Sequence, residues 1–327
     1  MTIDWPHFVK IVRSHQRFLL TSHIRPDCDC LGSELAMADL LQYLGKDVLI
    51  VNGMRTPPNL AFLDPQHRIR TIGEDIFVSK LPKVDVLMIL DTSAWVQLGP
   101  MAEVVRKTTA KKVLLDHHVS EDGLEAELFK DTEAEATGRL VLDAAGQLGV
   151  PLTAATAKVL FAAIATDTGW FRFGSTNAGT YRAAAQLVEA GARPHEIFRE
   201  LYEQDTLGRV RLRGVVLGRF ESEQDGRLVH TYVLKEDFTQ TGALPSDTED
   251  AINMGLAIAG TQMAVIMVEQ VVGGFKVSFR SRCHVDCSRL AQQFGGGGHK
   301  AAAGAFVPGS LDEARTRVLD AVRVAMG

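Results

Sequence analysis

The feature of this sequence that most restricts the fold is the almost uninterrupted apolar run from 84 to 90. Such a run is typical of a strand that is buried on both faces of a parallel sheet. Similar short apolar runs occur at 18–20, 47–51 and 112–115, and a helical pattern over 35–44 follows the first of them. This alternation predicts a doubly wound α/β domain with a mainly parallel sheet and right-handed crossovers.

The length of 327 residues predicts two domains, because one hydrophobic core seldom extends over so long a chain. In the second half the pattern shortens into strands at 228–233, 263–268 and 275–280, with hairpin turns at 225–226 and 273–274. We therefore expect a second, smaller C-terminal α/β domain with a mixed sheet. The expected limits are 1–190 for the first domain, 191–222 for a helical connection and 223–327 for the second domain.

Histidine and aspartate residues follow three of the apolar runs in the first domain. In open α/β sheets, ligands bind outside the carboxyl ends of the strands. Any one of these aspartates could cap the helix after it, but capping alone is a poor explanation for three such strand ends, two of which carry histidine. We interpret them as one metal site, because carboxylates and imidazoles bind divalent cations. The residues are His23, Asp27 and Asp29 after the first run, Asp91 after the run at 84–90, and Asp116, His117 and His118 after the run at 112–115.

Asp167 is a further candidate for this site. It follows an alanine-rich helical pattern over 153–165 and precedes Thr168 and Gly169. Asp167 could be an ordinary turn residue, but a carboxylate is poorly matched to the negative end of a helix dipole. That placement indicates a compensating cation.

Charge and cysteine content exclude several classes of protein. With 35 basic and 40 acidic residues the net charge is −5, which argues against a protein that coats long duplex nucleic acid. The four cysteines form two short-spaced pairs with no signal peptide before them, so we expect a cytoplasmic protein without a disulfide framework. Polar residues and glycines interrupt the apolar run from 251 to 268, and no membrane span is expected.

Taken together, these motifs resemble those of the DHH phosphoesterase superfamily. The glycine run at 295–298, followed by His299, looks like the signature of the DHH-associated C-terminal domain. The resemblance covers essentially the whole chain and is closest to the branch of nano-RNases and 3′-phosphoadenosine-5′-phosphate phosphatases. It implies a DHH catalytic domain and a substrate-binding domain with a cleft between them. The motifs are His23-Ile24-Arg25-Pro26-Asp27-Cys28-Asp29, Asp91, Asp116-His117-His118 and Asp167-Thr168-Gly169.

The resemblance also implies two divalent cations, Mn²⁺ being the expected metal, which activate water for attack on a phosphate ester. Asp116 would orient an imidazole, and His118 would contact the scissile phosphate or assist proton transfer. The implied ligands are His23 and Asp27 for one ion, Asp29, His117 and Asp167 for the other, and Asp91 for both. The sequence leaves open which of the adjacent histidines, His117 or His118, is the ligand.

The second domain is expected to hold the nucleotide end of the substrate. Two arginines alternate with Phe279 and Ser281, so they leave one face of a strand, and an arginine fork suits phosphate. The glycine run lets backbone amides approach an anion, and the histidine after it adds a donor. The predicted substrate-binding residues are Arg280, Arg282, Gly296, Gly297, Gly298 and His299.

We therefore expect a Mn²⁺-dependent phosphoesterase that acts on short oligoribonucleotides or 3′-phosphoadenosine-5′-phosphate. A hydrolase of cyclic di-AMP or linear pApA fits the same residues. A pyrophosphatase would share the metal motifs but not the glycine-rich second domain. A nucleotide-binding regulatory protein without turnover would be indicated by a missing ligand, and none of the six is missing. The expected partners are short RNA or nucleotides, with no membrane, and a homodimer is left open.

Cys28 and Cys30 occupy positions where the family more often has small residues. The simpler interpretation is that one small residue replaces another. A thiolate at Cys28, which lies between the ligand carboxylates Asp27 and Asp29, would instead favour zinc or make the activity sensitive to oxidation.

Overall fold

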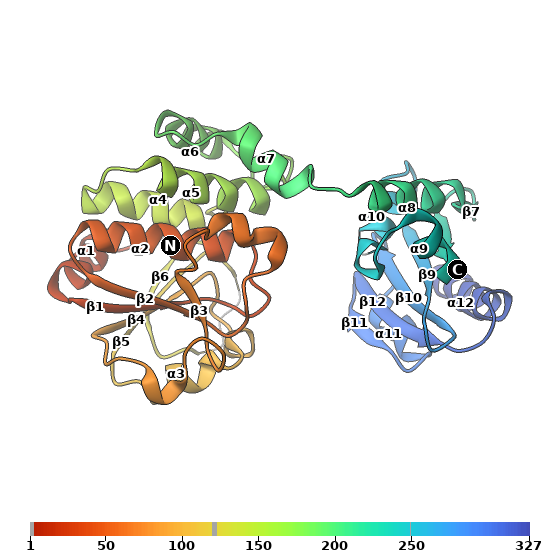
Figure 1. The fold of residues 1–327 in the computed structure, drawn as a ribbon, viewed down its shortest axis with the longest axis horizontal. Helices are drawn as coiled ribbons and strands as arrows, with labels where there is room; N and C mark the ends of the chain where they lie inside the picture. Colours follow the sequence, from red (N-terminus) through yellow and green to blue (C-terminus); the bar gives the residue numbers. More distant parts are fainter. Residues whose placement is uncertain (1–2, 120–122, 249) are drawn as a thin grey trace. The chain divides into compact units, whose positions relative to one another are not determined.

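Six parallel strands form the central sheet of the first half of the chain (Figure 1). They are β1 (Arg17–Thr21), β2 (Asp47–Asn52), β3 (Ile69–Thr71), β4 (Val86–Leu90), β5 (Lys111–Asp116) and β6 (Glu127–Lys130). Their order in the sheet is β3-β2-β1-β4-β5-β6, and every neighbouring pair is parallel. The expected parallel α/β sheet is therefore confirmed.

The structure is a computed structural model that describes residues 3–119, 123–248 and 250–327. It divides into a first unit that ends at Gln204 and a second that begins at Asp205. This boundary falls inside the segment at 191–222 that we expect to connect the domains, and the domain limits themselves stay predictions.

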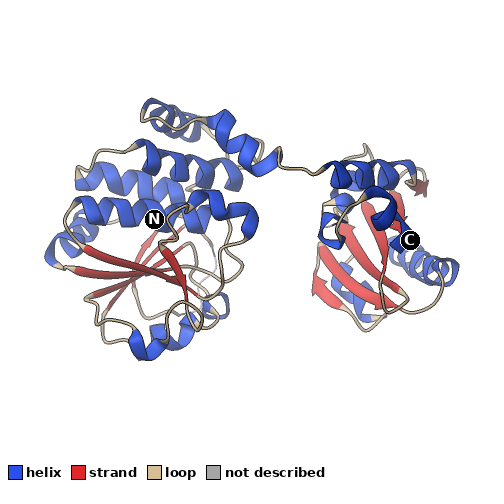
Figure 2. Cartoon of the chain, in the orientation of Figure 1, coloured by secondary structure: helices blue, strands red, loops and turns tan. Residues whose placement is uncertain are grey.

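Helices cover both faces of the parallel sheet (Figure 2). One core, which includes Phe18 and Met88, lies under α1, α2, α4 and α5, while a second core, which includes Leu19 and Leu87, lies under α3. Neighbouring residues of one strand thus enter opposite cores, which explains the uninterrupted apolar runs. The helices of this unit are α1 (Trp5–Ser14), α2 (Cys28–Tyr43), α3 (Met101–Lys107), α4 (Thr137–Leu148), α5 (Ala154–Asp167), α6 (Ala178–Glu189) and α7 (Pro194–Tyr202), with 3-10 turns η1 (Pro58–Leu63), η2 (Val78–Lys80) and η3 (Trp95–Leu98).

Helices α2 and α5 approach each other closely. A Cβ atom on Gly32 would lie 2.5 Å from the carbonyl oxygen of Val159, so this approach requires glycine. The first turn of α2 carries Asp29 and the last residue of α5 is Asp167. The packing of these two helices brings both carboxylates into one group of donor atoms.

The second unit contains a mixed six-stranded sheet, as expected. Its strands are β7 (Glu221–Glu223), β8 (Leu228–Val233), β9 (Met263–Glu269), β10 (Phe275–Ser281), β11 (Gly297–His299) and β12 (Ala302–Val307). Their order is β11-β12-β10-β9-β8-β7, with β8 and β9 parallel and the other pairs antiparallel. The turns predicted at 225–226 and 273–274 join β7 to β8 and β9 to β10.

Two cores also flank the second sheet. Val277 and Phe279 face α11 and α12, whereas Ala264 and Ile266 face α8 and α10. The helices are α8 (Leu207–Gly218), α9 (Lys235–Thr241), α10 (Ala251–Leu256), α11 (Cys287–Gln292) and α12 (Leu311–Met326), with the 3-10 turn η4 (Pro245–Thr248). The apolar run at 251–268 is thus a helix followed by a strand. Within the described ranges no helix is both long and apolar enough to span a membrane.

Candidate metal centre

The predicted metal residues meet at one edge of the parallel sheet. Strand β1 lies beside β4, with β2 and β3 on one side of this pair and β5 and β6 on the other. In open α/β sheets, ligands bind at such a reversal of strand order. His23 follows β1, Asp91 follows β4 and His117 follows β5, so segments far apart in sequence supply one site.

The first group of donor atoms surrounds His23. Its Nε2 atom lies 3.3 Å from Asp91 Oδ2 and 3.7 Å from Asp27 Oδ2. The other ring nitrogen, Nδ1, lies 2.9 Å from the carbonyl oxygen of Ile24, which fixes the ring with Nε2 toward the acids. Cys30 Sγ joins this group, whose donor atoms all lie within 4.8 Å of one another.

The second group surrounds His117. Its Nε2 atom lies 3.5 Å from Asp167 Oδ2, 3.7 Å from Asp29 Oδ2 and 3.6 Å from Asp91 Oδ1. Nδ1 of the same ring lies 3.1 Å from the carbonyl oxygen of Ala134, so Nε2 again faces the carboxylates. The structure therefore brings all six predicted ligands into two adjoining groups.

Asp91 lies between the two groups. Its Oδ2 atom faces His23 and its Oδ1 atom faces His117, where Thr137 Oγ1 also donates a hydrogen bond at 2.8 Å. The backbone of Asp91 has φ +62°, a left-handed conformation that is uncommon outside glycine. Such strained conformations cost about 1–3 kcal/mol and persist where the surroundings hold them. One carboxylate is thereby presented to both groups.

Asp27 combines the two roles that the sequence left open for it. Its Oδ1 atom accepts hydrogen bonds from the backbone N–H groups of Asp29 and Cys30, at 3.0 and 3.1 Å, and so caps α2. The remaining oxygen, Oδ2, is the one that faces His23.

Asp29 caps a different helix, which the sequence did not indicate. It accepts hydrogen bonds from the backbone N–H groups of Thr137, at 2.7 Å, and Gly138, at 2.8 Å, at the start of α4. The residue at the N-cap position of α4, Ala136, has no side chain able to cap it. A helix that begins without its own Ser, Thr, Asp or Asn cap was the one available signal for this contact.

Burial raises the pKa of both Asp29 and Asp91 well above the usual range. The next largest cause for Asp29 is the charge of Asp91, and for Asp91 it is the charge of Asp27. Burial also raises the pKa of Asp167. A cation bound among these groups removes their repulsion and restores the ionised forms. Because the donors are carboxylate oxygens and imidazole nitrogens, the residues fit divalent metal ions.

Asp116 and His118 form a hydrogen-bonded pair, and His118 also belongs to a third group of donor atoms, with Asp91 and His117. Nδ1 of His118 donates to Asp116 Oδ1 at 2.8 Å, and this bond raises the pKa of the imidazole. Burial acts to raise the pKa of Asp116, but the hydrogen bonds from His118 lower it overall. The His118 side chain is 48% exposed, in contrast to 2% for Asp91. A readily protonated imidazole is therefore held at the open side of the cluster.

In the second unit, Arg280 and His299 lie on one face of the sheet. Arg280 on β10 and His299 on β11 are both register partners of Ala302 on β12. Directly paired residues of antiparallel strands project to the same face. The two predicted substrate contacts are thus separated by one strand and point the same way.

Next to Arg280 and His299, this face of the sheet consists largely of glycine backbone. Gly297 pairs with Gly304, which in turn pairs with Ser278, so little side chain stands above the backbone there. Lys276 and Phe306, a further pair on this face, are both exposed. A shallow pocket at this place is lined by Gln270, Lys276, Gly296, Gly297, Gly304, Ala305 and Phe306.

Two glycines of the run have a structural requirement that sequence reasoning did not give. A Cβ atom on Gly296 would lie 2.2 Å from the carbonyl oxygen of Gly304, and one on Gly298 would lie 2.6 Å from that of Ala302. Close pairing with β12 therefore demands glycine at both positions. Gly297, by contrast, has open space above it.

Arg282 has a partner within the fold. It follows the last residue of β10, and its Nη1 atom donates to the carbonyl oxygen of Leu256, the last residue of α10, at 2.9 Å. A guanidinium in this position stabilises the C-terminus of a helix. Arg280 donates to the carbonyl oxygen of Phe279 at 3.1 Å.

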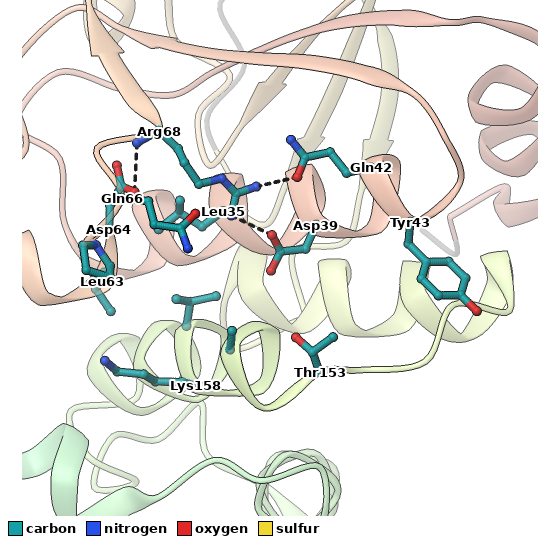
Figure 3. Close-up of a pocket in the computed structure, with 13 residues that line it drawn as sticks. Leu35, Asp39, Gln42, Tyr43, Leu63, Asp64, Gln66, Arg68, Thr153 and Lys158 are labelled. Carbon is teal, nitrogen blue, oxygen red and sulfur yellow. Dashed lines mark hydrogen bonds and ion pairs between the residues drawn. The ribbon is translucent and has the colours of Figure 1, made fainter.

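A separate pocket lies between α2 and α5 (Figure 3). Arg68 forms part of its wall and donates to Asp39 Oδ1 at 2.6 Å and to Gln42 Oε1 at 3.1 Å. None of the predicted site residues lines this pocket. The lining residues are Leu35, Asp39, Gln42, Tyr43, Leu63, Asp64, Pro65, Gln66, Arg68, Thr153, Ala155, Lys158 and Val159.

Comparison with known proteins gives a consistent result for both units. A family model described as "DHH family, N-terminal domain" matches residues 17–164, and one described as "DHHA1 domain" matches residues 225–326. The bifunctional oligoribonuclease and PAP phosphatase NrnA of Thermus thermophilus is 33% identical over 306 residues, which cover 93% of this chain and 88% of that protein.

Solved structures agree in fold. An exopolyphosphatase-related protein from Bacteroides fragilis superposes with a TM-score of 0.82 at 25% identity, over 98% of this chain and 95% of that chain. The exonuclease RecJ bound to manganese superposes with a TM-score of 0.53 at 14% identity, over 99% and 96% of the two chains, which is a likeness of fold.

Proposed function

Because the chain belongs to the DHH family and is a hydrolase that acts on phosphoester bonds, we propose that it hydrolyses short oligoribonucleotides, 3′-phosphoadenosine-5′-phosphate, or both. The observation that carries this proposal is the convergence of histidine and aspartate donors from three strand ends and from α5. The relative from Thermus thermophilus, which is named for both activities, supports the substrate class.

We further propose that the cluster holds two divalent cations, with Mn²⁺ as the first choice. Manganese bound to RecJ, a protein of the same fold, supports this metal. When bound, such cations polarise a phosphoryl oxygen and lower the pKa of water, so that a nucleophile is available at neutral pH. In this assignment His23 and Asp27 hold one ion, Asp29, His117 and Asp167 hold the other, and Asp91 contacts both.

His118 and Asp116 are proposed to act on the substrate side of the reaction. In hydrolysis a water oxygen bonds to phosphorus, the phosphorus–ester oxygen bond breaks, and the leaving oxygen gains a proton. Asp116 accepts a hydrogen bond from Nδ1 of His118 and so favours the protonated imidazole. The half-exposed ring can then contact the phosphate and supply the proton to the leaving oxygen.

The open face of the second sheet is proposed to bind the nucleotide. Arg280 and His299 supply donors for phosphate or ribose oxygens, and the floor at Gly297 lets a planar base or a phosphate approach the backbone. Few side chains define this surface, which suits short substrates that differ in their bases.

A hydrolysis panel tests the proposal. The full chain, with Mn²⁺ added, is incubated with the RNA dinucleotide pUpU, 3′-phosphoadenosine-5′-phosphate, cyclic di-AMP and inorganic pyrophosphate. We expect turnover of the dinucleotide, of 3′-phosphoadenosine-5′-phosphate, or of both, ahead of the other two. Faster turnover of cyclic di-AMP would assign a different substrate to the same site. A metal-loaded protein that hydrolyses none of the four would contradict the proposed function.

A further inference from the structure

The two cysteines of the first turn of α2 have different surroundings. Cys30 is completely buried, and its Sγ atom lies in one donor group with His23 Nε2, a carboxylate oxygen of Asp27 and one of Asp91. All four donor atoms of this group lie within 4.8 Å of one another. No other cysteine of the described ranges belongs to such a group.

Cys28 and Cys30 stand on either side of Asp29 in the sequence, but their side chains point to different sides of α2. Positions two apart on a helix lie on nearly opposite sides of it. Both cysteines are buried in the same hydrophobic core, but Cys28 interacts with Thr166 of α5 and, unlike Cys30, belongs to none of the groups of metal-ligating donor atoms. It therefore provides a matched reference for Cys30.

Two hydrogen bonds fix the position of the Cys30 sulfur. The backbone N–H of Asp27 donates to Sγ at 3.3 Å, and the thiol is 3.4 Å from the carbonyl oxygen of Asp27. In the first bond the sulfur is the acceptor, so this bond is retained when the thiol loses its proton. The sulfur is thus held beside the donor atoms of His23 and Asp27 by the same turn that carries them.

We propose that Cys30 Sγ is a ligand, as thiolate, of the cation held by His23, Asp27 and Asp91. This inference rests on the proposed function only in assuming that a cation occupies this position. On binding, the S–H bond breaks, a sulfur–metal bond forms and the proton passes to the solvent. The position then has one sulfur, one nitrogen and two carboxylate ligands.

The added sulfur makes the two metal positions chemically unequal. Thiolate favours softer ions such as Zn²⁺ over Mn²⁺, whereas carboxylate and imidazole accept Mn²⁺ readily. The group formed by Asp29, His117 and Asp167 contains only oxygen and nitrogen donors. The position that includes Cys30 therefore prefers zinc, cobalt or ferrous iron more strongly than its neighbour does.

Cobalt absorption spectroscopy tests this assignment directly. The metal-free full chain is titrated with Co²⁺, which gives a sulfur-to-cobalt charge-transfer band in the near ultraviolet only when thiolate is bound. We expect the band in the unchanged protein and in Cys28→Ser, and its loss in Cys30→Ser. In competition titrations Cys30→Ser should weaken Zn²⁺ binding at least about tenfold while Mn²⁺ binding changes less. A band that persists in Cys30→Ser, or that is absent from the cobalt-loaded unchanged protein, would overturn the assignment.

A second measurement needs no variant and covers the case in which Cys30→Ser does not fold. X-ray absorption of the zinc-loaded unchanged protein should show sulfur at about 2.3 Å from zinc. A first shell of only oxygen and nitrogen would reject the sulfur ligand. The hydrolysis panel separates the two proposals, because turnover without sulfur ligation removes this inference alone, and sulfur ligation without turnover of any substrate removes the proposed function alone.

Discussion

The two units of this protein carry candidate functional surfaces of opposite kinds. In the first unit the groups are side chains, from the buried Asp29 and Asp91 to the exposed Asp27, whose donor atoms are held 3.3–3.7 Å apart by caps and by a strained backbone. In the second unit the surface is an exposed sheet face whose floor is glycine backbone, with one arginine and one histidine beside it. Bond cleavage needs fixed charges at fixed positions, whereas the binding of varied nucleotides needs an open surface with few anchors.

The largest effect on turnover is expected from replacing Asp91. Replacing it by Asn removes a charge that faces both histidines, and turnover of the preferred substrate should fall by about a thousandfold or more. The measurement is kcat at saturating Mn²⁺, with thermal unfolding to verify the fold. Asp143→Asn, which alters a carboxylate on α4 that pairs with Arg139 outside the cluster, should retain normal turnover. Comparable activity of the two variants would refute the shared role of Asp91.

Substitutions on the open face of the second unit should act mainly on binding. Arg280→Ala and His299→Ala each remove a donor for an anionic group, and we expect KM to rise by about 10–100-fold with a smaller change in kcat. Arg289→Ala is the control, because Arg289 is an exposed arginine of α11, which covers the opposite face. If kcat falls and KM does not change, it is wrong to assign bond cleavage to the first unit and nucleotide binding to the second.

Alanine substitutions should distinguish Gly298, which packs closely against β12, from Gly297, which has open space above it. Gly298→Ala places a methyl group against Ala302 and Ala303 at φ +147°, and should destabilise the protein by about 1–3 kcal/mol. Gly297→Ala meets open space and should leave stability nearly unchanged. Chemical unfolding of the two variants supplies the comparison, and equal losses would mean that pairing with β12 does not set this requirement.

The smallest expected effect concerns the two ends of β4. Asp85, just before the strand, accepts hydrogen bonds from the side chain and backbone of Arg17, which lower its pKa, whereas the pKa of Asp91, just after the strand, is raised. A lowered pKa contributes stability above the unfolded value of about 3.9 and loses it as the pH falls. Asp85→Asn should therefore be less stable than the unchanged protein at pH 7, with a difference that begins to shrink as the pH falls below about 4. A difference independent of pH would exclude this pair as its source.

The sequence predicted those parts of the architecture that short local patterns of residues specify. The apolar run at 84–90 and the runs before and after it in the sequence predicted the parallel sheet. The acids at the strand ends predicted the cluster of donor atoms. The capping of α4 by Asp29 depends on a contact across 108 residues, which no local pattern records. Likewise β11 forms on a run of glycine that has little strand propensity of its own, because pairing with β12 overrides it.

The bond between Asp29 and the first turn of α4 also bears on how the chain folds. It closes a long loop, and such closure occurs only after the intervening strands have found their places. An isolated α2 with its preceding loop would hold His23 and Asp27 near each other but would leave the Asp29 carboxylate without its two amide donors. If the cluster binds metal as proposed, high-affinity capture by the second donor group would be a late event and would report that the first unit has completed its folding.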